Sequence, residues 1–208
     1  EEVLRLASTS DFTFAEVDKL GKLKEDFTYT QKHIDSILKL SLVNIEAIRK
    51  ANFKVAIDCV NSVGGIAIPA LLEALGVQQI EKLYCDPNGQ FPHNPEPLPE
   101  HLRDISNLIK EKKADIGFVV DPDVDRLAII NENGSMFGEE YTLVAVADYV
   151  LQHTPGNTAS NLSSTRALRD VTEKYGCAYT ASAVGEVNVV TAMKATHCVI
   201  GGEGNGGV

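Results

Sequence analysis

An acidic hexapeptide lies between two short apolar runs, and this arrangement restricts the local fold more than any other part of the sequence. The hexapeptide reads Asp121-Pro122-Asp123-Val124-Asp125-Arg126. The run 116–120 precedes it and the run 127–130 follows it, and both have the length and the branched aliphatic content of buried strands. The sequence therefore predicts a turn between two strands, stiffened by Pro122, in which three carboxylates gather.

This cluster of carboxylates indicates a divalent cation. Three ionised carboxylates in one turn raise one another's pKa values unless a cation compensates them. The side chains of Asp121, Asp123 and Asp125 offer hard oxygen atoms, and no Cys or His is near them in the sequence. Mg²⁺, Mn²⁺ or Ca²⁺ therefore fits better than zinc. The adjacent Arg126 favours an anionic substrate, and phosphate suits its planar guanidinium best.

Two other interpretations of the hexapeptide stay open at this point. Asp121, Asp123, Asp125 and Glu132 occupy positions 1, 3, 5 and 12 of an EF-hand calcium loop. Position 6 of that loop requires glycine, but it is Arg126 here, and the flanks are typical of strands rather than helices. A solvated acidic turn without any ion is the second alternative.

A glycine-rich segment, 202–207, closes the sequence. Its pattern also satisfies the G-x-G-x-x-G fingerprint of dinucleotide-binding proteins, but Glu203 would then face the pyrophosphate. A carboxylate and an amide among glycines suit neutral hydroxyl groups better, because Glu203 can accept two hydrogen bonds and Asn205 can both donate and accept. A purely conformational glycine turn stays open as an alternative.

Strand-like and helix-like segments alternate from residue 54 onward, which is typical of largely parallel sheets flanked by helices. The Asn-Glu-Asn-Gly turn at 131–134 precedes a domain boundary that we place near Ser135. The sequence thus predicts two consecutive α/β domains with mostly parallel or mixed sheets. Their predicted ranges are 25–135 and 136–208, after a tail or linker at 1–24.

Charge and cysteine content exclude some classes of protein. A net charge of −10 argues against nucleic acid or an anionic membrane as the main partner. No apolar run is long enough to cross a bilayer, and no signal peptide is visible. The four cysteines show no metal-binding or C-x-x-C spacing, so we predict buried free thiols and a cytoplasmic location.

The two motifs together resemble the α-D-phosphohexomutases, the phosphoglucomutase and phosphomannomutase superfamily. The acidic hexapeptide resembles the metal-binding loop of that family, and 202–207 resembles its sugar-binding loop, in the family's order and about eighty residues apart. A proline-rich segment at 91–97 resembles a further loop of the family. The resemblance extends from about Lys54 to the end of the sequence.

The resemblance implies an isomerase that interconverts hexose 1-phosphates and hexose 6-phosphates of the glucose or mannose type. A phosphoserine would transfer its phosphoryl group through a bisphosphorylated sugar, with Mg²⁺ as the cofactor and phosphorylated hexoses as the partners. Phosphoglucosamine mutase, of the same superfamily, is the alternative. The implied site consists of the metal ligands Asp121, Asp123 and Asp125, the phosphate contact Arg126, and the sugar contacts Glu203, Asn205, Gly185 and Glu186.

The resemblance also implies a fragment of a four-domain enzyme. The range 25–135 would be its second domain and 136–208 a truncated third domain, with the first and fourth domains missing. We find no Ser-His-Asn-Pro type phosphoserine loop and no fourth-domain phosphate loop in the 208 residues. The fragment alone is therefore expected to be inactive. From other classes, a nucleotide-binding oxidoreductase and a non-catalytic calcium-binding module remain as alternatives.

Overall fold

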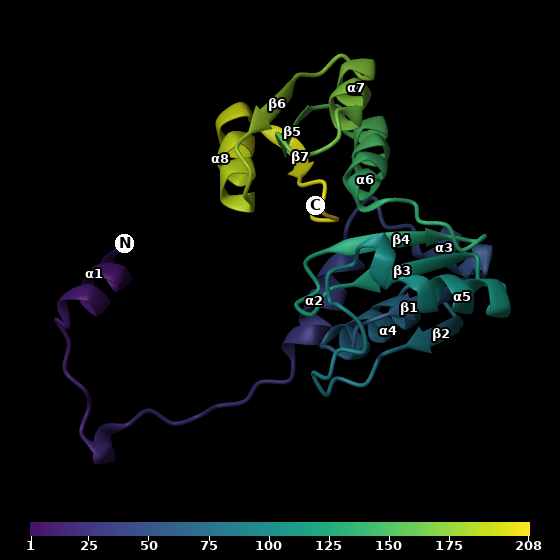
Figure 1. Cartoon of the computed structure of the whole chain (residues 1–208). Helices are drawn as coiled ribbons and strands as arrows, with labels where there is room; N and C mark the ends of the chain where they lie inside the picture. Colours follow the sequence, from purple (N-terminus) through teal and green to yellow (C-terminus); the bar gives the residue numbers. More distant parts are fainter.

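The computed structural model describes residues 1–208 and contains two β-sheets, each covered by helices (Figure 1). The first sheet has the strand order β2-β1-β3-β4. Strand β1 pairs in parallel with β2 and β3, whereas β4 pairs antiparallel with β3. The acidic hexapeptide joins β3 to β4, so the predicted turn between two strands is confirmed. The strands are β1 (Lys54–Asp58), β2 (Gln79–Leu83), β3 (Ile116–Val120) and β4 (Leu127–Asn131).

Helices cover both faces of the first sheet because successive side chains of a strand point to opposite faces. In β1, Ala56 packs with the apolar side of α5 (Arg103–Lys112), and its neighbours Val55 and Ile57 pack with α4 (Gly64–Ala74) on the other face. Ile48 of α3 (Ile45–Ala51) packs at the edge of this second cluster. The remaining helix of this part is α2 (Tyr29–Ile37).

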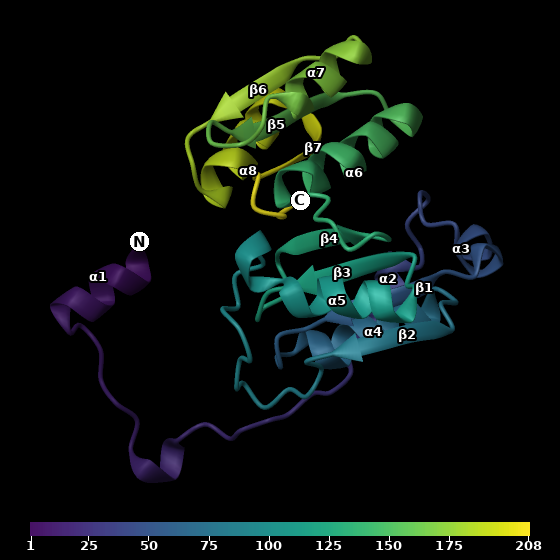
Figure 2. The same cartoon turned by 45° about the vertical axis from the view of Figure 1, so that its right-hand side comes forward.

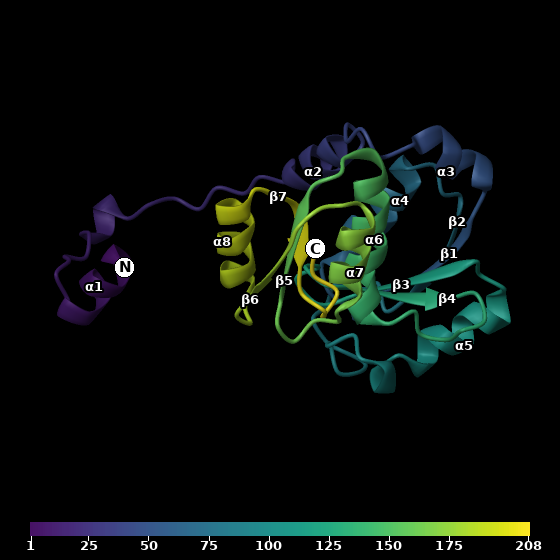
Figure 3. The ribbon, with the colours of Figure 1, turned by 90° about the horizontal axis from the view of Figure 1, so that it is seen from above.

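The second sheet is parallel throughout, with the order β6-β5-β7. Seen from above, α6 and α7 lie on one side of it and α8 on the other (Figure 3). Leu143, Ala147, Leu168 and Ile200 form the buried cluster on the α6 and α7 side. The elements are α6 (Glu139–His153), β5 (Asn157–Asn161), α7 (Ala167–Lys174), β6 (Tyr179–Ser182), α8 (Glu186–Thr196) and β7 (Cys198–Gly202).

The predicted fold class, two consecutive α/β units with mixed and parallel sheets, is therefore confirmed. The apolar residues of the segment 98–113 have helical spacing, which predicts a helix over this range, but α5 begins only at Arg103 because Pro99 opens a separate 3₁₀ turn, η2 (Pro99–His101). The first residues contain a helix, α1 (Glu2–Thr9), and a 3₁₀ turn, η1 (Val17–Lys19), where no clean period is visible in the sequence. This segment extends away from the two sheets (Figures 1 and 2).

The cysteine prediction holds only in part. All four cysteines are free thiols, but only Cys59 is buried, and Cys85, Cys177 and Cys198 are half-buried. The half-buried cysteines lie at or beyond strand and helix ends, where the covering layer is incomplete. None of the helices combines the length and the apolar character needed to cross a bilayer.

Cys85 should react with iodoacetamide at least about tenfold faster than Cys59 in the native protein, because the thiolate is the nucleophile. A hydrogen bond from Cys59 lowers the pKa of the Cys85 thiol, whereas the same contact and burial raise the pKa of Cys59. Peptide mapping by mass spectrometry after brief alkylation measures both rates. In denaturant the two thiols should react alike, and faster labelling of native Cys59 would contradict the assignment.

Candidate functional site

The acidic turn brings three carboxylates together. One oxygen atom each of Asp121, Asp123 and Asp125 lies within 4.8 Å of the others. Asp121 is buried, and the other two are exposed. Three converging hard oxygen ligands that leave open positions fit a cation such as Mg²⁺, which keeps several water ligands. The residues present therefore fit the predicted metal.

Hydrogen bonds within the turn fix the buried ligand. Oδ1 of Asp121 accepts the backbone N–H groups of Asp125 and Arg126, each at 3.1 Å. Val124, which immediately precedes Asp125, has a φ of 63°. This left-handed conformation costs a β-branched residue about 1–3 kcal/mol. Its N–H donates to the Asp121 carbonyl at 3.2 Å. The turn is thus held in a strained conformation that aims the carboxylates at one point.

Electrostatics in the turn favour a cation. Burial and, to a smaller extent, the neighbouring carboxylates of Asp125 and Asp123 raise the pKa of Asp121 to about 6, although the backbone hydrogen bond from Arg126 lowers it. The ionised form is therefore disfavoured without a counter-charge. A divalent ion bound by the three carboxylates would stabilise the ionised form of Asp121.

Asp121→Asn should stabilise the metal-free protein at neutral pH. Because the folded pKa of Asp121 lies above its unfolded value, the protonated carboxyl favours folding below about pH 4, and this contribution disappears as the pH rises through 6. We expect a gain on the order of 1 kcal/mol at about pH 7.5, measured by urea unfolding with a chelator present. The same comparison at about pH 4 should show little difference. A loss of stability at about pH 7.5 would refute this account.

Arg126 lies beside the acidic turn but pairs most closely with a different segment. Its Nη1 is 3.3 Å from Oε1 of Glu96, in the proline-rich loop 86–98. Its Nε lies 4.0 Å from Oδ2 of Asp121 and 4.0 Å from Oδ1 of Asp125. Nη2 makes no hydrogen bond and no ion pair. One nitrogen of the guanidinium is therefore free to meet an anionic oxygen.

The glycine-rich segment forms a loop after β7 that is tied to two other strand ends. Glu203 Oε1 accepts a short hydrogen bond from Nδ2 of Asn161 and a 2.8 Å hydrogen bond from the N–H of Gly185. Oε2 has only a 3.4 Å contact with Nδ2 of Asn205. One carboxylate oxygen is thus fixed by the protein, and the other is available to a hydroxyl group.

Sequence reasoning missed the residues that support this loop. Asn161 at the end of β5 orients Glu203, and Ser164 accepts the N–H of Gly204 at 2.8 Å. Glu140 of α6 accepts the N–H of Thr165 in the same turn. The available signal was positional, since the carboxyl ends of neighbouring parallel strands meet at one edge of a sheet, where ligands bind in open α/β folds.

The two predicted loops meet in space. The N–H of Leu127, one residue after Arg126, donates to the carbonyl of Gly206 at 3.1 Å. The C-terminal end lies near β4 and below the second sheet in Figure 2. Thr142, near the start of α6, also donates from Oγ1 to the Leu127 carbonyl at 2.9 Å, so this helix contacts the same strand end. Residues about eighty positions apart in sequence therefore form one site.

A pocket of about 640 Å³ lies where the loops meet. Its lining includes three carboxylates, Asp125, Glu186 and Glu203, and one cation, Arg126, so its side chains carry a net formal charge of −2. This charge suits the hydroxyl groups of a neutral ring better than a bare anion, and a divalent ion bound at the turn would offset it. The predicted Glu186 and Asn205 lie in the lining, whereas the N–H of Gly185 orients Glu203.

The EF-hand alternative is wrong for this turn. Strands β3 and β4 flank the acidic hexapeptide, whereas an EF-hand loop joins two helices. Glu132, which would be the bidentate ligand at position 12, lies beyond the end of β4 and is absent from the cluster of carboxylates.

Comparison with known proteins agrees with this geometry. Residues 31–134 match the family model of phosphoglucomutase/phosphomannomutase α/β/α domain II, and residues 138–208 match the model of domain III. A phosphoglucomutase/phosphomannomutase of Thermococcus kodakarensis is 34% identical over 209 residues, covering 99% of this chain and 45% of that protein. A probable phosphoglucosamine mutase of Methanopyrus kandleri is 30% identical over 198 residues, covering 94% and 42%.

A solved structure gives the same result. The crystal structure of a phosphoglucomutase/phosphomannomutase family protein from Burkholderia thailandensis superimposes with a TM-score of 0.82 at 25% identity, covering 98% of this chain and 43% of that one. The chain thus spans less than half the length of the relatives it matches.

Proposed function

Because the chain belongs to the phosphoglucomutase/phosphomannomutase family, we propose that it forms the metal-binding and sugar-binding centre of a phosphohexomutase. The reaction is the interconversion of hexose 1-phosphate and hexose 6-phosphate, of the glucose or mannose type, through a phosphoserine and a bisphosphorylated sugar. The observation that carries the proposal is the Leu127–Gly206 hydrogen bond, which joins the acidic turn and the glycine-rich loop around one pocket.

Each predicted residue has a chemical role in this proposal. Asp121, Asp123 and Asp125 would hold Mg²⁺, which supplies compensation for phosphoryl charge when bound. The free Nη2 of Arg126 binds a phosphate oxygen. The sugar hydroxyls donate to Oε2 of Glu203 and exchange hydrogen bonds with Asn205.

In our proposal, segments that are not part of this chain complete the active site. The phosphoserine and a further phosphate-binding loop come from parts of the full-length protein that these 208 residues do not include. Because phosphoryl transfer depends on positioning and electrostatic stabilisation, the isolated chain should show no mutase turnover. A cytoplasmic location, which free cysteines indicate, belongs to the same proposal.

The hexose is the open part of the proposal, and phosphoglucosamine is the second candidate substrate. One relative is a probable phosphoglucosamine mutase, at 30% identity. The acidic pocket would also suit an amino sugar, since Glu186 and Glu203 face it. Competition between glucose 1-phosphate, mannose 1-phosphate and glucosamine 1-phosphate for the same site distinguishes these sugars.

Calorimetric titration of the chain tests the proposal. With Mg²⁺ present, glucose 1-phosphate and glucose 1,6-bisphosphate should bind more tightly than inorganic phosphate, because the ring contacts Glu203 and Asn205. Glu203→Gln should weaken hexose phosphate binding about tenfold and leave Mg²⁺ and inorganic phosphate binding unchanged. Hexose phosphates that bind no better than inorganic phosphate would refute the sugar site.

A further inference from the structure

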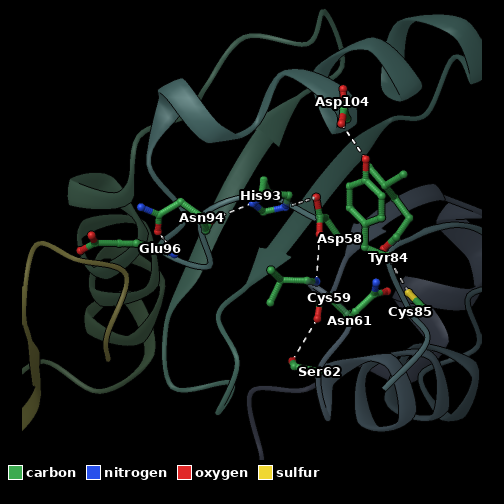
Figure 4. Close-up of polar contacts among 12 residues, drawn as sticks. Asp58, Cys59, Asn61, Ser62, Tyr84, Cys85, His93, Asn94, Glu96 and Asp104 are labelled. Carbon is green, nitrogen blue, oxygen red and sulfur yellow. Dashed lines mark hydrogen bonds and ion pairs between the residues drawn. The ribbon is translucent and has the colours of Figure 1, made fainter. Parts of the chain in front are cut away.

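The proline-rich loop 86–98, which connects β2 to η2, is fastened to the end of β1. Nε2 of His93 lies 3.1 Å from Oδ2 of Asp58, the last residue of β1, whose side chain is almost fully buried (Figure 4). Asn61 adds three contacts. Its Nδ2 donates to the Gln90 carbonyl at 3.1 Å, its Oδ1 accepts the N–H of Asp86 at 3.3 Å, and its backbone carbonyl accepts the N–H of Gly89 at 3.0 Å. The loop is therefore held near its start by Asn61 and at its middle by the contact between His93 and the buried carboxyl group of Asp58.

The hydrogen-bond partners of His93 require a shared proton. Nδ1 lies 2.7 Å from the carbonyl oxygen of Asn94, which can only accept. Nε2 faces Oδ2 of Asp58, while Oδ1 of Asp58 already accepts the N–H of Val60 at 3.0 Å. A neutral imidazole has only one N–H, so either both ring nitrogens are protonated or Asp58 carries the proton. Loss of that proton places the lone pair of one ring nitrogen against an oxygen atom, either the Asp58 carboxylate or the Asn94 carbonyl according to the tautomer.

None of the other titratable groups near Asp58 supplies the proton of the His93–Asp58 contact. Asp104 on α5 accepts the hydroxyl of Tyr84 at 2.6 Å, and the Tyr84 ring lies 5.7 Å from the His93 ring. Lys82 and the thiols of Cys59 and Cys85 lie near the same end of β1 and β2. Lys54 and Glu81, the other titratable residues of these strands, pair with each other at 3.1 Å. Burial raises the pKa of Asp58, which agrees with a proton held between it and His93.

The other end of the same loop contacts the arginine of the site. Asn94, next to His93, accepts the N–H of Glu96 through Oδ1 at 3.0 Å, so the backbone from His93 to Glu96 forms a short bracket. Glu96 Oε1 then lies 3.3 Å from Nη1 of Arg126. Figure 4 shows Glu96 at the far side of the loop from Asp58, pointing away from it. The segment 93–96 thus contacts Asp58 through its first residue, His93, and Arg126 through its last residue, Glu96.

We propose that His93 and Glu96 are positioning residues, in which the proton shared by His93 and Asp58 fastens the loop and the loop orients the guanidinium of Arg126. The loop holds Nη1 and leaves Nη2 directed to an anion. Only this last step, phosphate binding by Arg126, rests on the proposed function. When rising pH removes the shared proton, His93 keeps only one of its two hydrogen bonds, so the attachment of the loop to β1 weakens and Arg126 becomes less ordered.

Two ligand-free measurements test the loop. Protection of the Glu96 and Leu98 amides, which donate to Asn94 Oδ1 and to the Glu96 carbonyl, against hydrogen exchange reports the order of the loop, and the NMR signal of the Arg126 Nε–H reports the order of the guanidinium. In the wild type, protection measured from about pH 6 to about pH 9 should fall about tenfold with rising pH, because loss of the shared proton removes one hydrogen bond of His93. His93→Ala should lower protection and broaden the arginine signal at every pH.

Matched variants separate positioning from folding. His93→Gln keeps a neutral donor toward Asp58 and should remove the pH dependence while retaining part of the protection. His153, whose Nδ1 also faces a carbonyl at 2.9 Å but whose ring faces no carboxylate, supplies the control variant His153→Gln, which should behave as the wild type. Glu96→Gln should disorder the Arg126 signal without detaching the loop from β1.

Sulfate titration tests the last step, because the charge of sulfate is constant over this pH range. Sulfate affinity should fall with rising pH in the wild type and stay constant in His93→Gln. Loop protection that is independent of pH in the wild type, or an Arg126 signal unchanged in His93→Ala, would overturn the inference. Since both are read without ligand, they remain decisive even if the chain binds no hexose phosphate, the outcome that would refute the proposed function instead.

Discussion

Gly206→Ala should detach the glycine-rich loop from the acidic turn. Gly206 has a φ of 92°, and a Cβ there would lie 2.6 Å from the oxygen and 2.8 Å from the nitrogen of the Leu127 backbone. Neither backbone atom can move without disturbing the β3–β4 pair, where Leu127 faces Val120. We expect a cost of more than about 3 kcal/mol for the docked loop.

Hydrogen exchange of the Leu127 amide measures this prediction directly, because that N–H donates to the Gly206 carbonyl. Its exchange should become about 100-fold faster in Gly206→Ala. Gly176→Ala is the matched control, since Gly176 has a φ of 71° and open space around a Cβ, so it measures backbone strain alone. If the two variants behave alike, contact with Leu127 is not what excludes a side chain at position 206.

The parts of the site that sequence reasoning found are those whose residues are contiguous. Asp121, Asp123 and Asp125 form one turn, and the apolar runs on each side have the length of strands, so the cluster and its mount could both be predicted. Glu203 and Asn205 were found for the same reason. Local sequence contains the ligand types and their spacing, and short turns convert spacing into geometry.

The contacts between distant segments could not be predicted. The Asp58–His93 contact joins residues 35 positions apart, and the Asn161–Glu203 contact joins residues 42 positions apart. Such pairs depend on how strand ends and loops are placed, which the periodicity of one segment does not specify. For the same reason the sequence did not identify Asp58 as the partner of His93. The helix α1 was also missed, and none of its residues is buried.

Asp123→Ala should abolish the binding of Mg²⁺ and Mn²⁺ to the isolated chain. The side chain of Asp123 is exposed and supplies one of three converging oxygen atoms, so its removal takes a ligand away without opening a cavity. We expect affinity to fall by at least about 100-fold, because even residues that only support metal ligands contribute about 10- to 100-fold. Calorimetric titration measures the affinity, and the circular dichroism spectrum should be unchanged.

Glu132→Gln is the informative control for this loss. Glu132 is equally acidic and only nine positions from Asp123 in the sequence, but it lies beyond β4 and outside the carboxylate cluster. The Glu132→Gln variant should bind Mg²⁺ as the wild type does. In a calcium loop of the EF-hand type, the same substitution would remove the bidentate ligand. Because both variants remove one negative charge, a difference between them isolates direct coordination from the general attraction of an acidic protein for cations. If Mg²⁺ binding persists in Asp123→Ala, the metal does not bind at this turn, and the proposed role of Arg126 beside the metal is refuted as well.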